Sequence, residues 1–566
     1  MSSSSSQTTL TSLPFELQLQ IFRDYFKIDG GYVFNGDSEK LTANGKPIDL
    51  ALMYTCRSIA HSTKHMPLSL NTIHFSTLYR SDWMPLAGCF DYVTIFYPLL
   101  AADMLVRLEP FITPKMYSQL GLEYPAFTSR LQELSRIHQE DLDRVEPGGP
   151  DTVLRGERSG KASDWTDQFR GDPDQYLGIR HQDTHCDLAA STRRCVRATQ
   201  ETTFYFLRLL AESQPIEFSK LVYETLPHWV DTHPAHEFLD LGFNLWDIPS
   251  RSELEHVSSR LNVDDAWQIV DPWYYRPQHS YKSGTYDPLH KGTRCREKIR
   301  FSAAAAAIRF LTKRLLVDQR RQIRNVILHE DFLAAGNPSS HAQGLAPFFR
   351  ENPQLRVERR VSVIRCISEG RRLERDIPSH VVWFLQEPSH PHLRGYREYR
   401  ESMLSAGFSE VIAQWLLDAL AVPDAGIPAE SFTFVLEGGP DPDFSTNLFQ
   451  QIIHRDIAWH KAYRASIERG LLVRWPLLLG DTLVSDGFPE AMDHLMNRTS
   501  LLHSDFNLGH QWNWEDMIEK ESGVTTWKWY SEFHYRDPLR TTFPPALDYA
   551  SILADNYDIQ TEDEYC

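Results

Sequence analysis

Two hydrophobic patterns, one with the period of a helix and one with the period of a strand, alternate along residues 186–540, and this alternation limits the folds open to the chain. Apolar residues at helical spacing predict helices over 199–212, 302–321, 399–420 and 445–469. Short runs rich in β-branched residues predict strands over 326–328, 355–364, 381–385 and 432–436. Because helices and strands interleave, we expect a mixed α/β (α+β), predominantly helical fold.

The strand predicted over 355–364 alternates apolar residues with Arg356, Glu358 and Arg360, which is typical of a strand that buries one face. No internal period of the solenoid or propeller kind is present in the sequence. This argues against leucine-rich and WD-type repeats. We therefore expect one large mixed domain over 186–540.

The composition excludes some classes of function. The chain has 566 residues, of which 42% are hydrophobic and 12% aromatic, so a large core is available. The net charge of −18 works against non-specific binding of nucleic acid, which needs a basic surface. The seven cysteines are scattered and form no C-x-x-C pair, which predicts reduced thiols in the cytoplasm or the nucleus.

The sequence predicts neither secretion nor membrane insertion. Residues 1–9 form a Ser/Thr/Gln tract that lacks the charged and apolar regions of a signal peptide. The apolar run over 84–108 is interrupted by Asp91, Pro98 and Asp103. We therefore expect this run to form a buried helix or a pair of strands, and no membrane span.

Residues 13–26 carry the pattern of a helix. Pro14 suits the first turn, where its missing N–H group costs no hydrogen bond, and Glu16 suits the positive end of the helix dipole. Leu13, Leu17 and Ile21 follow one another at intervals of four and form an apolar stripe.

A second helix is expected to begin near Asp49, a favourable N-cap. Leu52, Cys56 and Ile59 give this helix an apolar face. The polar insert from Lys27 to Ile48 separates the two helices.

The Leu-Pro-Phe-Glu-Leu start at 13–17 and the Leu-Met-Tyr-Thr-Cys-Arg segment at 52–57 resemble the F-box, and more closely the divergent F-box-like module of many fungal proteins. A central block over 324–361 resembles large uncharacterised fungal proteins with the same kind of start. The resemblance implies an adapter that recruits a protein client to a cullin–RING ubiquitin ligase. It assigns binding of the ligase's small adaptor protein to Leu13, Pro14, Leu17, Ile21, Leu52, Cys56 and Ile59.

These observations together predict the domain organisation. The expected parts are a Ser-rich tail over 1–9, an F-box-like module over 10–76, a helical connection over 77–145, a Gly/Pro-rich loop or linker over 146–185, a client-binding α/β domain over 186–540 and an acidic tail over 541–566. Two other functions stay open: a scaffold protein without a ligase, and a cryptic phosphotransferase.

The phosphotransferase hypothesis depends on two short motifs. The triplet His-Arg-Asp at 454–456 heads the catalytic loop of protein kinases, in which a magnesium-binding Asn follows the Asp by five residues. Here position 461 is Lys. The triplet at 503–505 resembles small-molecule phosphotransferases, but position 510 is His where Asn is needed. We therefore expect no catalytic residues, and no enzyme.

His181, His185, Cys186 and Cys195 lie close together in the sequence, but without the spacing of a known zinc motif. We expect neither a metal nor a cofactor.

The stretch from Lys291 to Arg324 holds eleven Lys and Arg residues against two acidic ones. It predicts a surface helix with paired basic side chains or, alternatively, a docking face for an acidic partner. The aromatic pairs Trp512/Trp514 and Trp527/Trp529 fit two strands with an aromatic face in the core or, alternatively, a binding groove.

Overall fold

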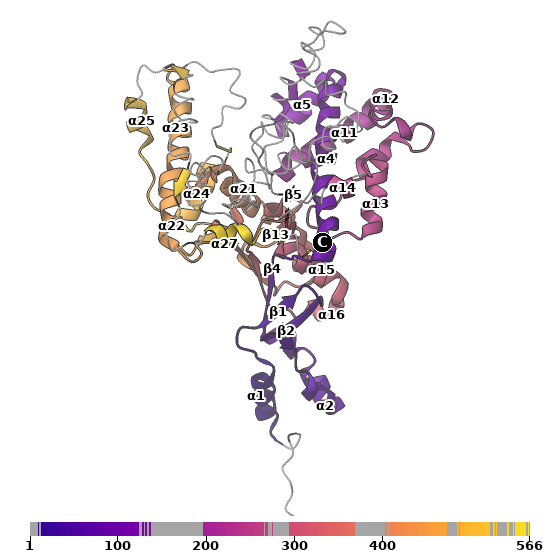
Figure 1. Cartoon of the computed structure of the whole chain (residues 1–566), viewed down its shortest axis with the longest axis vertical. Helices are drawn as coiled ribbons and strands as arrows, with labels where there is room; N and C mark the ends of the chain where they lie inside the picture. The colour runs from indigo at the N-terminus through magenta and orange to yellow at the C-terminus, as the bar shows by residue number, and fades with distance from the viewer. Residues whose placement is uncertain are drawn as a thin grey trace, which may run out of the picture.

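The computed structural model of the chain describes residues 13–123, 196–264, 294–367, 408–472 and 487–520, together with shorter pieces between and after these ranges. The predicted mixed α/β, predominantly helical fold is confirmed: many helices pack with one sheet of eight strands (Figure 1). The tail expected at 1–9 and the linker expected at 146–185 lie outside the described residues.

The eight-stranded sheet has the spatial order β11-β10-β8-β7-β4-β1-β2-β3. Its strands are β1 (Tyr32–Asn35), β2 (Lys40–Ala43), β3 (Lys46–Pro47), β4 (Thr72–Ser76), β7 (Asn325–Glu330), β8 (Arg356–Ser362), β10 (Phe432–Glu437) and β11 (Leu502–Ser504). The strands predicted over 326–328, 355–364 and 432–436 are β7, β8 and β10, whereas the segment 381–385 lies outside the described residues.

Six of these strands are parallel, and they lie side by side in the order in which they occur in the chain. Strands β2 and β3 extend the edge at β1 as antiparallel neighbours. Because parallel crossovers are almost always right-handed, strands that advance in one direction place their crossovers on one face of the sheet. Among the described strands the order never reverses, so the sheet has no switch-point crevice of the doubly wound kind.

The burial of the side chains agrees with this one-sided arrangement. Residues of one face are buried: Ile73, Phe75, Val326, Leu328, Val357, Val361, Phe434 and Leu436. Residues of the other face are partly exposed: His74, Ile327, His329, Glu358, Arg360, Thr433, Val435 and His503. We call this second set the open face. The parallel strands start at residues 32, 72, 325, 356, 432 and 502, and these unequal intervals explain why the sequence shows no repeat.

The helices of the described part are α1 (Phe15–Phe26), α2 (Arg57–Thr63), α3 (Met66–Leu70), α4 (Met84–Leu108), α5 (Pro114–Glu123), α11 (Val196–Ser213), α12 (Pro215–Thr225), α13 (Arg251–Arg260), α14 (Ala266–Ile269), α15 (Ala303–Arg314), α16 (Val317–Arg320), α17 (Ala346–Glu351), α21 (Phe408–Leu420), α22 (Pro442–Leu448), α23 (His454–Glu468), α24 (Phe488–Asn497), α25 (Trp514–Lys520) and α27 (Tyr549–Ala554). The predicted helix over 199–212 is α11, and that over 445–469 corresponds to α22 and α23.

Two helix predictions are wrong in their extent. The segment 302–321 forms α15 and α16, because Leu315 and Leu316 between them are extended. The segment 399–420 contains a short strand, β9 (Ser402–Leu404), and the helix α21 covers Phe408–Leu420.

One hydrophobic core contains side chains from Ile73 to Ile552. Helix α4 lies in it and packs against α11 and α13, so described residues from both sides of the predicted boundary at 186 share one core. The segment Ser81–Phe111 is long and apolar enough to span a membrane, but 78% of its most apolar window is buried inside the protein. This is the behaviour of a core helix, in agreement with the buried helix expected at 84–108.

Part of the segment expected to be an acidic tail, 541–566, is folded. This segment contains α27 and the strand β13 (Tyr557–Gln560), which pairs with β6 (Arg294–Glu297) in a three-stranded sheet with β5 (Tyr274–Tyr275). Asp558 accepts hydrogen bonds from Tyr79 at 2.6 Å and from Arg296 at 3.0 Å. Asp558 thereby joins the C-terminal segment to the basic stretch 291–324.

A buried ion pair connects β7, β8 and α15 behind the sheet. The guanidinium of Arg359 donates to the carboxylate of Glu330 at 2.7 Å, and both side chains are 1% exposed. The same carboxylate accepts from the backbone N–H groups of Ala303 and Ala304 at the start of α15, and Arg359 also donates to the carbonyl of Ser339. These contacts satisfy the charges that the fold removes from water.

A neutral histidine completes this buried network. His341 lies 2.7 Å from both the hydroxyl of Ser302 and the carbonyl of Gly336. Because the carbonyl can only accept, His341 Nε2 donates to it and Nδ1 accepts from Ser302. Glu330, Ser339, His341 and Arg359 all come from the block 324–361, so this block builds the interior behind the sheet.

The buried His341 predicts a pH dependence of stability. Burial lowers its pKa from 6.5 to about 3, so between these values only the unfolded chain takes up the proton. The contribution of the neutral His341 to the free energy of unfolding is therefore complete above pH 6.5. It is lost as the pH falls below this value, at about 1.4 kcal/mol per pH unit. Urea denaturation at pH 7, 6 and 5 should therefore show a flatter profile for His341→Gln than for the wild type. Equal slopes would contradict the assignment.

Candidate docking surface on the N-terminal helices

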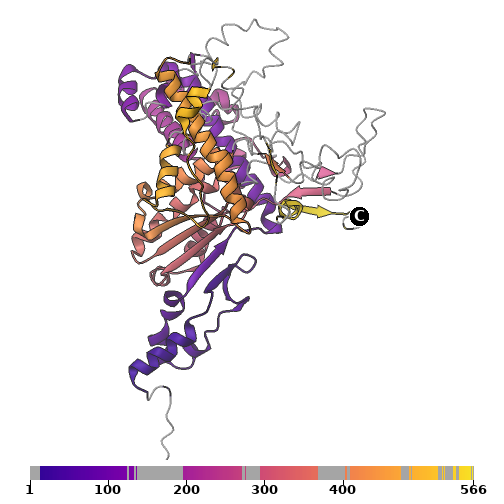
Figure 2. The ribbon, with the colours of Figure 1, turned by 90° about the vertical axis from the view of Figure 1, so that its left-hand side faces the viewer.

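Helices α1, α2 and α3, together with a 3-10 segment over Ala51–Tyr54, form a small unit at one end of the molecule, which we call the N-terminal module. Figure 1 and Figure 2 both show α1 and α2 beyond β1 and β2, away from the large core. The module has a core of its own, made of Phe22, Phe26, Ile59 and Met66.

Helix α1 is apolar on two sides. Phe22 and Phe26 point into the module and are 1% exposed. Leu17, Ile21 and Tyr25, spaced four residues apart, are 48%, 41% and 37% exposed. We call these three residues the docking stripe. Large apolar side chains gathered on an exposed helix mark an interaction site more often than scattered ones do.

Further apolar residues are exposed on the same module. Phe15 at the start of α1 is 62% exposed, and Tyr54 in the 3-10 segment is 82% exposed. Within the described residues, each of the other helices carries at most one exposed large apolar side chain. The N-terminal module is therefore the best candidate for a docking surface in the described part of the chain.

The seven residues that the sequence assigns to adaptor binding fall into three groups. Exposed are Pro14, Leu17, Ile21 and Cys56; partly buried are Leu13 and Leu52; buried is Ile59. Ile59, only 6% exposed, packs with Phe22 and Phe26 and is not available to a partner in this conformation. The sequence pattern predicts one helix with Leu52, Cys56 and Ile59 on a common face. The structure divides this helix into the 3-10 segment and α2, so the three residues do not lie on one continuous helix and the burial of Ile59 could not be predicted.

Sequence reasoning missed three exposed apolar residues as site members: Phe15, Tyr25 and Tyr54. Tyr25 continues the spacing of Leu17 and Ile21, and this spacing was the available signal. Phe15 and Tyr54 carry no such signal, because their exposure depends on how the module packs.

The insert from Lys27 to Ile48 forms strands β1, β2 and β3, so the expected module over 10–76 shares residues with the central sheet. The tip of its hairpin is held by Glu39, which pairs with Arg309 at 2.9 Å and with Arg314. The insert leaves the docking stripe exposed and joins the module to the body of the protein.

A single buried amide secures the junction between module and sheet. Asn71, 2% exposed, donates to the carbonyls of Phe26 and Pro67 at 2.7 and 2.8 Å, and its side-chain oxygen accepts from the N–H of Ile28. The end of α1, the end of α3 and the start of β4 are thereby fixed to one another.

The basic stretch 291–324 is largely paired within the protein. Its arginines contact acidic residues elsewhere: Arg296 contacts Asp558, Arg309 and Arg314 contact Glu39, and Arg320 contacts Glu351. Arg300 is 5% exposed, and burial lowers its pKa to about 10. This arrangement corresponds to the first of the two interpretations of the stretch, in which basic side chains pair inside the structure.

The residues of the phosphotransferase motifs are not brought together in a pocket. Asp456 is 6% exposed, accepts from Ser409 at 2.6 Å and pairs with Arg455; burial raises its pKa. Asp505 is exposed and accepts from the N–H of Gly438 at 2.8 Å. His181, His185, Cys186 and Cys195 lie outside the described residues. Within the described part, no group of three His, Cys, Asp or Glu side chains is arranged to hold a metal ion.

The strand interpretation of the tryptophans is wrong for Trp514. Trp514 begins the helix α25 and not a strand, and Trp512 is 37% exposed and donates to the carbonyl of Gln450 at 3.0 Å. Trp527 and Trp529 lie outside the described residues.

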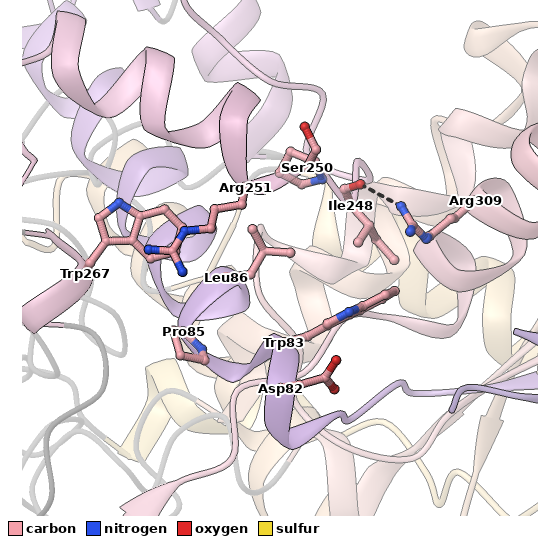
Figure 3. Close-up of a pocket in the computed structure, with 10 residues that line it drawn as sticks. Asp82, Trp83, Pro85, Leu86, Ile248, Ser250, Arg251, Trp267 and Arg309 are labelled. Carbon is pink, nitrogen blue, oxygen red and sulfur yellow. Dashed lines mark hydrogen bonds between the residues drawn. The ribbon is translucent and has the colours of Figure 1, made fainter. Parts of the chain in front are cut away.

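A pocket of about 300 Å³ lies between the start of α4 and the start of α13 (Figure 3). Its walls include Trp83, Trp267 and Leu86. The two arginines that line the pocket contact other residues of the protein. Arg309 lies 4.8 Å from the ring of Trp83 and donates to the carbonyl of Ile248, and Arg251 lies 4.9 Å from the ring of Trp267. The size is at the lower limit for a ligand pocket.

A second pocket, of about 500 Å³, lies between α4, α11 and the loop at 239–247. Neither pocket is lined by Asp456 or Asp505. The two concave sites thus give no support to phosphate chemistry at the motif residues.

Comparison of the chain with protein-family models, with curated proteins and with solved structures found no match.

Proposed function

We propose that this protein is a non-enzymatic docking adapter, whose N-terminal module binds the small adaptor protein of a cullin–RING ubiquitin ligase while its α/β body binds a client. The single observation that carries the proposal is the exposed docking stripe on α1. The stripe begins at Leu17, the last residue of the Leu-Pro-Phe-Glu-Leu start that resembles the F-box.

The energy available from the stripe is moderate. Full burial of one such side chain is worth roughly 1.5–3 kcal/mol, and the three side chains are already about half-buried. Covering the stripe thus supplies about 3 kcal/mol before the costs of association. Phe15 and Tyr54 extend the apolar area, and aromatic side chains of this kind often dominate binding interfaces.

The test is co-purification of the full chain with the ligase adaptor, followed by measurement of the dissociation constant. The double variant Leu17→Asp/Ile21→Asp should weaken binding by at least roughly 100-fold, because each charge would have to be buried in an apolar contact. Both residues are exposed, so the free protein should keep its fold, which circular dichroism can verify.

Ile216→Asp is the matched control, because Ile216 is 78% exposed and belongs to α12, remote from α1 in the sequence. It should bind like the wild type. Failure of the folded wild-type protein to bind the adaptor would refute the ligase proposal and leave the scaffold hypothesis. Undiminished binding by the double variant would show that the stripe is not the contact.

A further inference from the structure

Two histidines meet on the open face of the sheet. His74 belongs to β4 and His329 to β7, and these strands are parallel neighbours. His74 Nδ1 lies 3.1 Å from His329 Nε2, and the ring planes differ by 12°. Both side chains are partly exposed, so water has access to the pair.

The register of the strands produces this approach. His74 lies opposite Ile327, and Ser76 lies opposite His329, so the two histidines occupy diagonal positions on the same face. Diagonal neighbours are within reach of each other when their side chains are long or aromatic. The pairing is thus fixed by the backbone of two central strands.

We propose that His74 and His329 form a two-imidazole binding site for a divalent transition-metal ion of the class that includes Zn²⁺, Cu²⁺ and Ni²⁺. With metal–nitrogen bonds of about 2.05 Å, nitrogens 3.1 Å apart subtend an angle of about 100° at the ion. This angle lies between the octahedral and the tetrahedral values. Imidazole nitrogen is a preferred ligand of these three ions.

The pair provides two ligands, and water fills the remaining positions. Without the ion, one ring donates an N–H group to the other. To bind the ion, the donating ring moves this proton to its other nitrogen, so that both facing nitrogens present lone pairs. Burial, and then the nearby His329 and Arg360, lower the pKa of His74.

The charges around the pair bear on its affinity. Arg360 on β8 lies opposite His329 and opposes a bound cation, but it is itself paired with Glu358 at 2.5 Å and with Glu437 at 3.0 Å. Asp331, next along the chain after β7, interacts electrostatically with His329 and favours a cation. These opposing charges and the two protein ligands favour an exchangeable ion over a permanently held one.

The first experiment is a titration of the full-length protein with Zn²⁺ alone, in competition with a chromogenic chelator at pH 7.5. His74→Ala and His329→Ala should each remove one binding equivalent, or weaken it at least about tenfold through loss of chelation. His503→Ala, a histidine of the same face on β11, is the matched control and should keep this equivalent.

A second measurement identifies the ligands directly. Electron paramagnetic resonance of the protein with one equivalent of Cu²⁺ should show coupling to two imidazole nitrogens, reduced to at most one in either alanine variant. Circular dichroism and thermal unfolding without metal identify any variant that has lost its fold, and His74→Gln or His329→Gln then replaces it. Zinc stoichiometry and copper spectra that are the same in the folded variants as in the wild type would overturn the proposal.

Discussion

Arg359→Met is expected to lower the free energy of unfolding by about 3–5 kcal/mol, because it leaves a buried carboxylate without its cation. Glu330 is 1% exposed and accepts from Arg359 through two nitrogens, at 2.7 and 3.0 Å. The N–H groups of Ala303 and Ala304 remain as partners, but they carry no full charge. Urea denaturation at neutral pH measures the loss.

Arg360→Met is the matched control for this experiment. Arg360 is the next residue, and its pairs with Glu358 and Glu437 are on the open face, where its side chain is 36% exposed. Exposed pairs contribute about 0–1 kcal/mol, so this variant should remain close to the wild type. The variant Arg359→Met/Glu330→Gln should regain part of the loss, since no buried charge is then unpaired. Equal stabilities of Arg359→Met and Arg360→Met would contradict the assignment.

Trp229→Ala should destabilise the protein by about 3–5 kcal/mol through the cavity that it leaves. Trp229 is 0% exposed and belongs to the large core. Its indole Nε1 donates to the carbonyl of Arg260 at 2.7 Å, and the guanidinium of Arg260 lies 4.7 Å from the ring centre. Removal of the ring thus costs packing, a hydrogen bond and a cation–π contact together.

Two further substitutions separate these contributions. Trp229→Phe keeps most of the apolar volume and should cost less than Trp229→Ala. Trp512→Ala removes an indole that is 37% exposed, so the cavity contribution should be small. Thermal unfolding of the three variants checks the order. A loss for Trp229→Ala no greater than that for Trp512→Ala would show that the core relaxes around the missing ring.

The sequence predicts strands β7, β8 and β10 well and the strands of the N-terminal insert poorly. Strands β7, β8 and β10 are rich in β-branched or aromatic residues, so their period is visible. Strand β1 has four residues, Tyr32–Asn35, inside a segment that reads as a polar insert. Its place in the sheet depends on parallel pairing with β4, a contact between segments that no local pattern encodes.

Charged residues show a second limit of the sequence. The alternation in β8 assigns Arg356, Glu358 and Arg360 to the polar face, and Arg359 falls between Val357 and Val361 on the buried face. An arginine at an apolar position of a strand is a signal for a buried partner, and Glu330 at the end of β7 is such a partner. The sequence alone could not join them, because the strand neighbours were unknown.

The docking stripe shows a third limit. Spacing at four residues identifies Leu17, Ile21 and Tyr25 as one side of α1 but cannot say whether that side faces inward. Phe22 and Phe26 on the other side fill the small core of the module. Only one apolar side of α1 can face the core of the module. Which side does so depends on the packing of the whole module and cannot be predicted from the spacing alone.

The one-sided sheet also bears on how such a chain can change its length. The segment between β4 and β7 runs from residue 77 to residue 324 and contributes α4, α11 and α15, whereas that between β7 and β8 covers only 331–355. Both begin and end at adjacent parallel strands. Insertions in the crossovers can therefore accumulate on the covered face of the sheet without displacing the side chains of the open face. Side chains of the open face can be substituted one at a time, whereas the face covered by the crossovers can gain or lose whole helices. The two faces of the sheet are therefore independent targets for engineering.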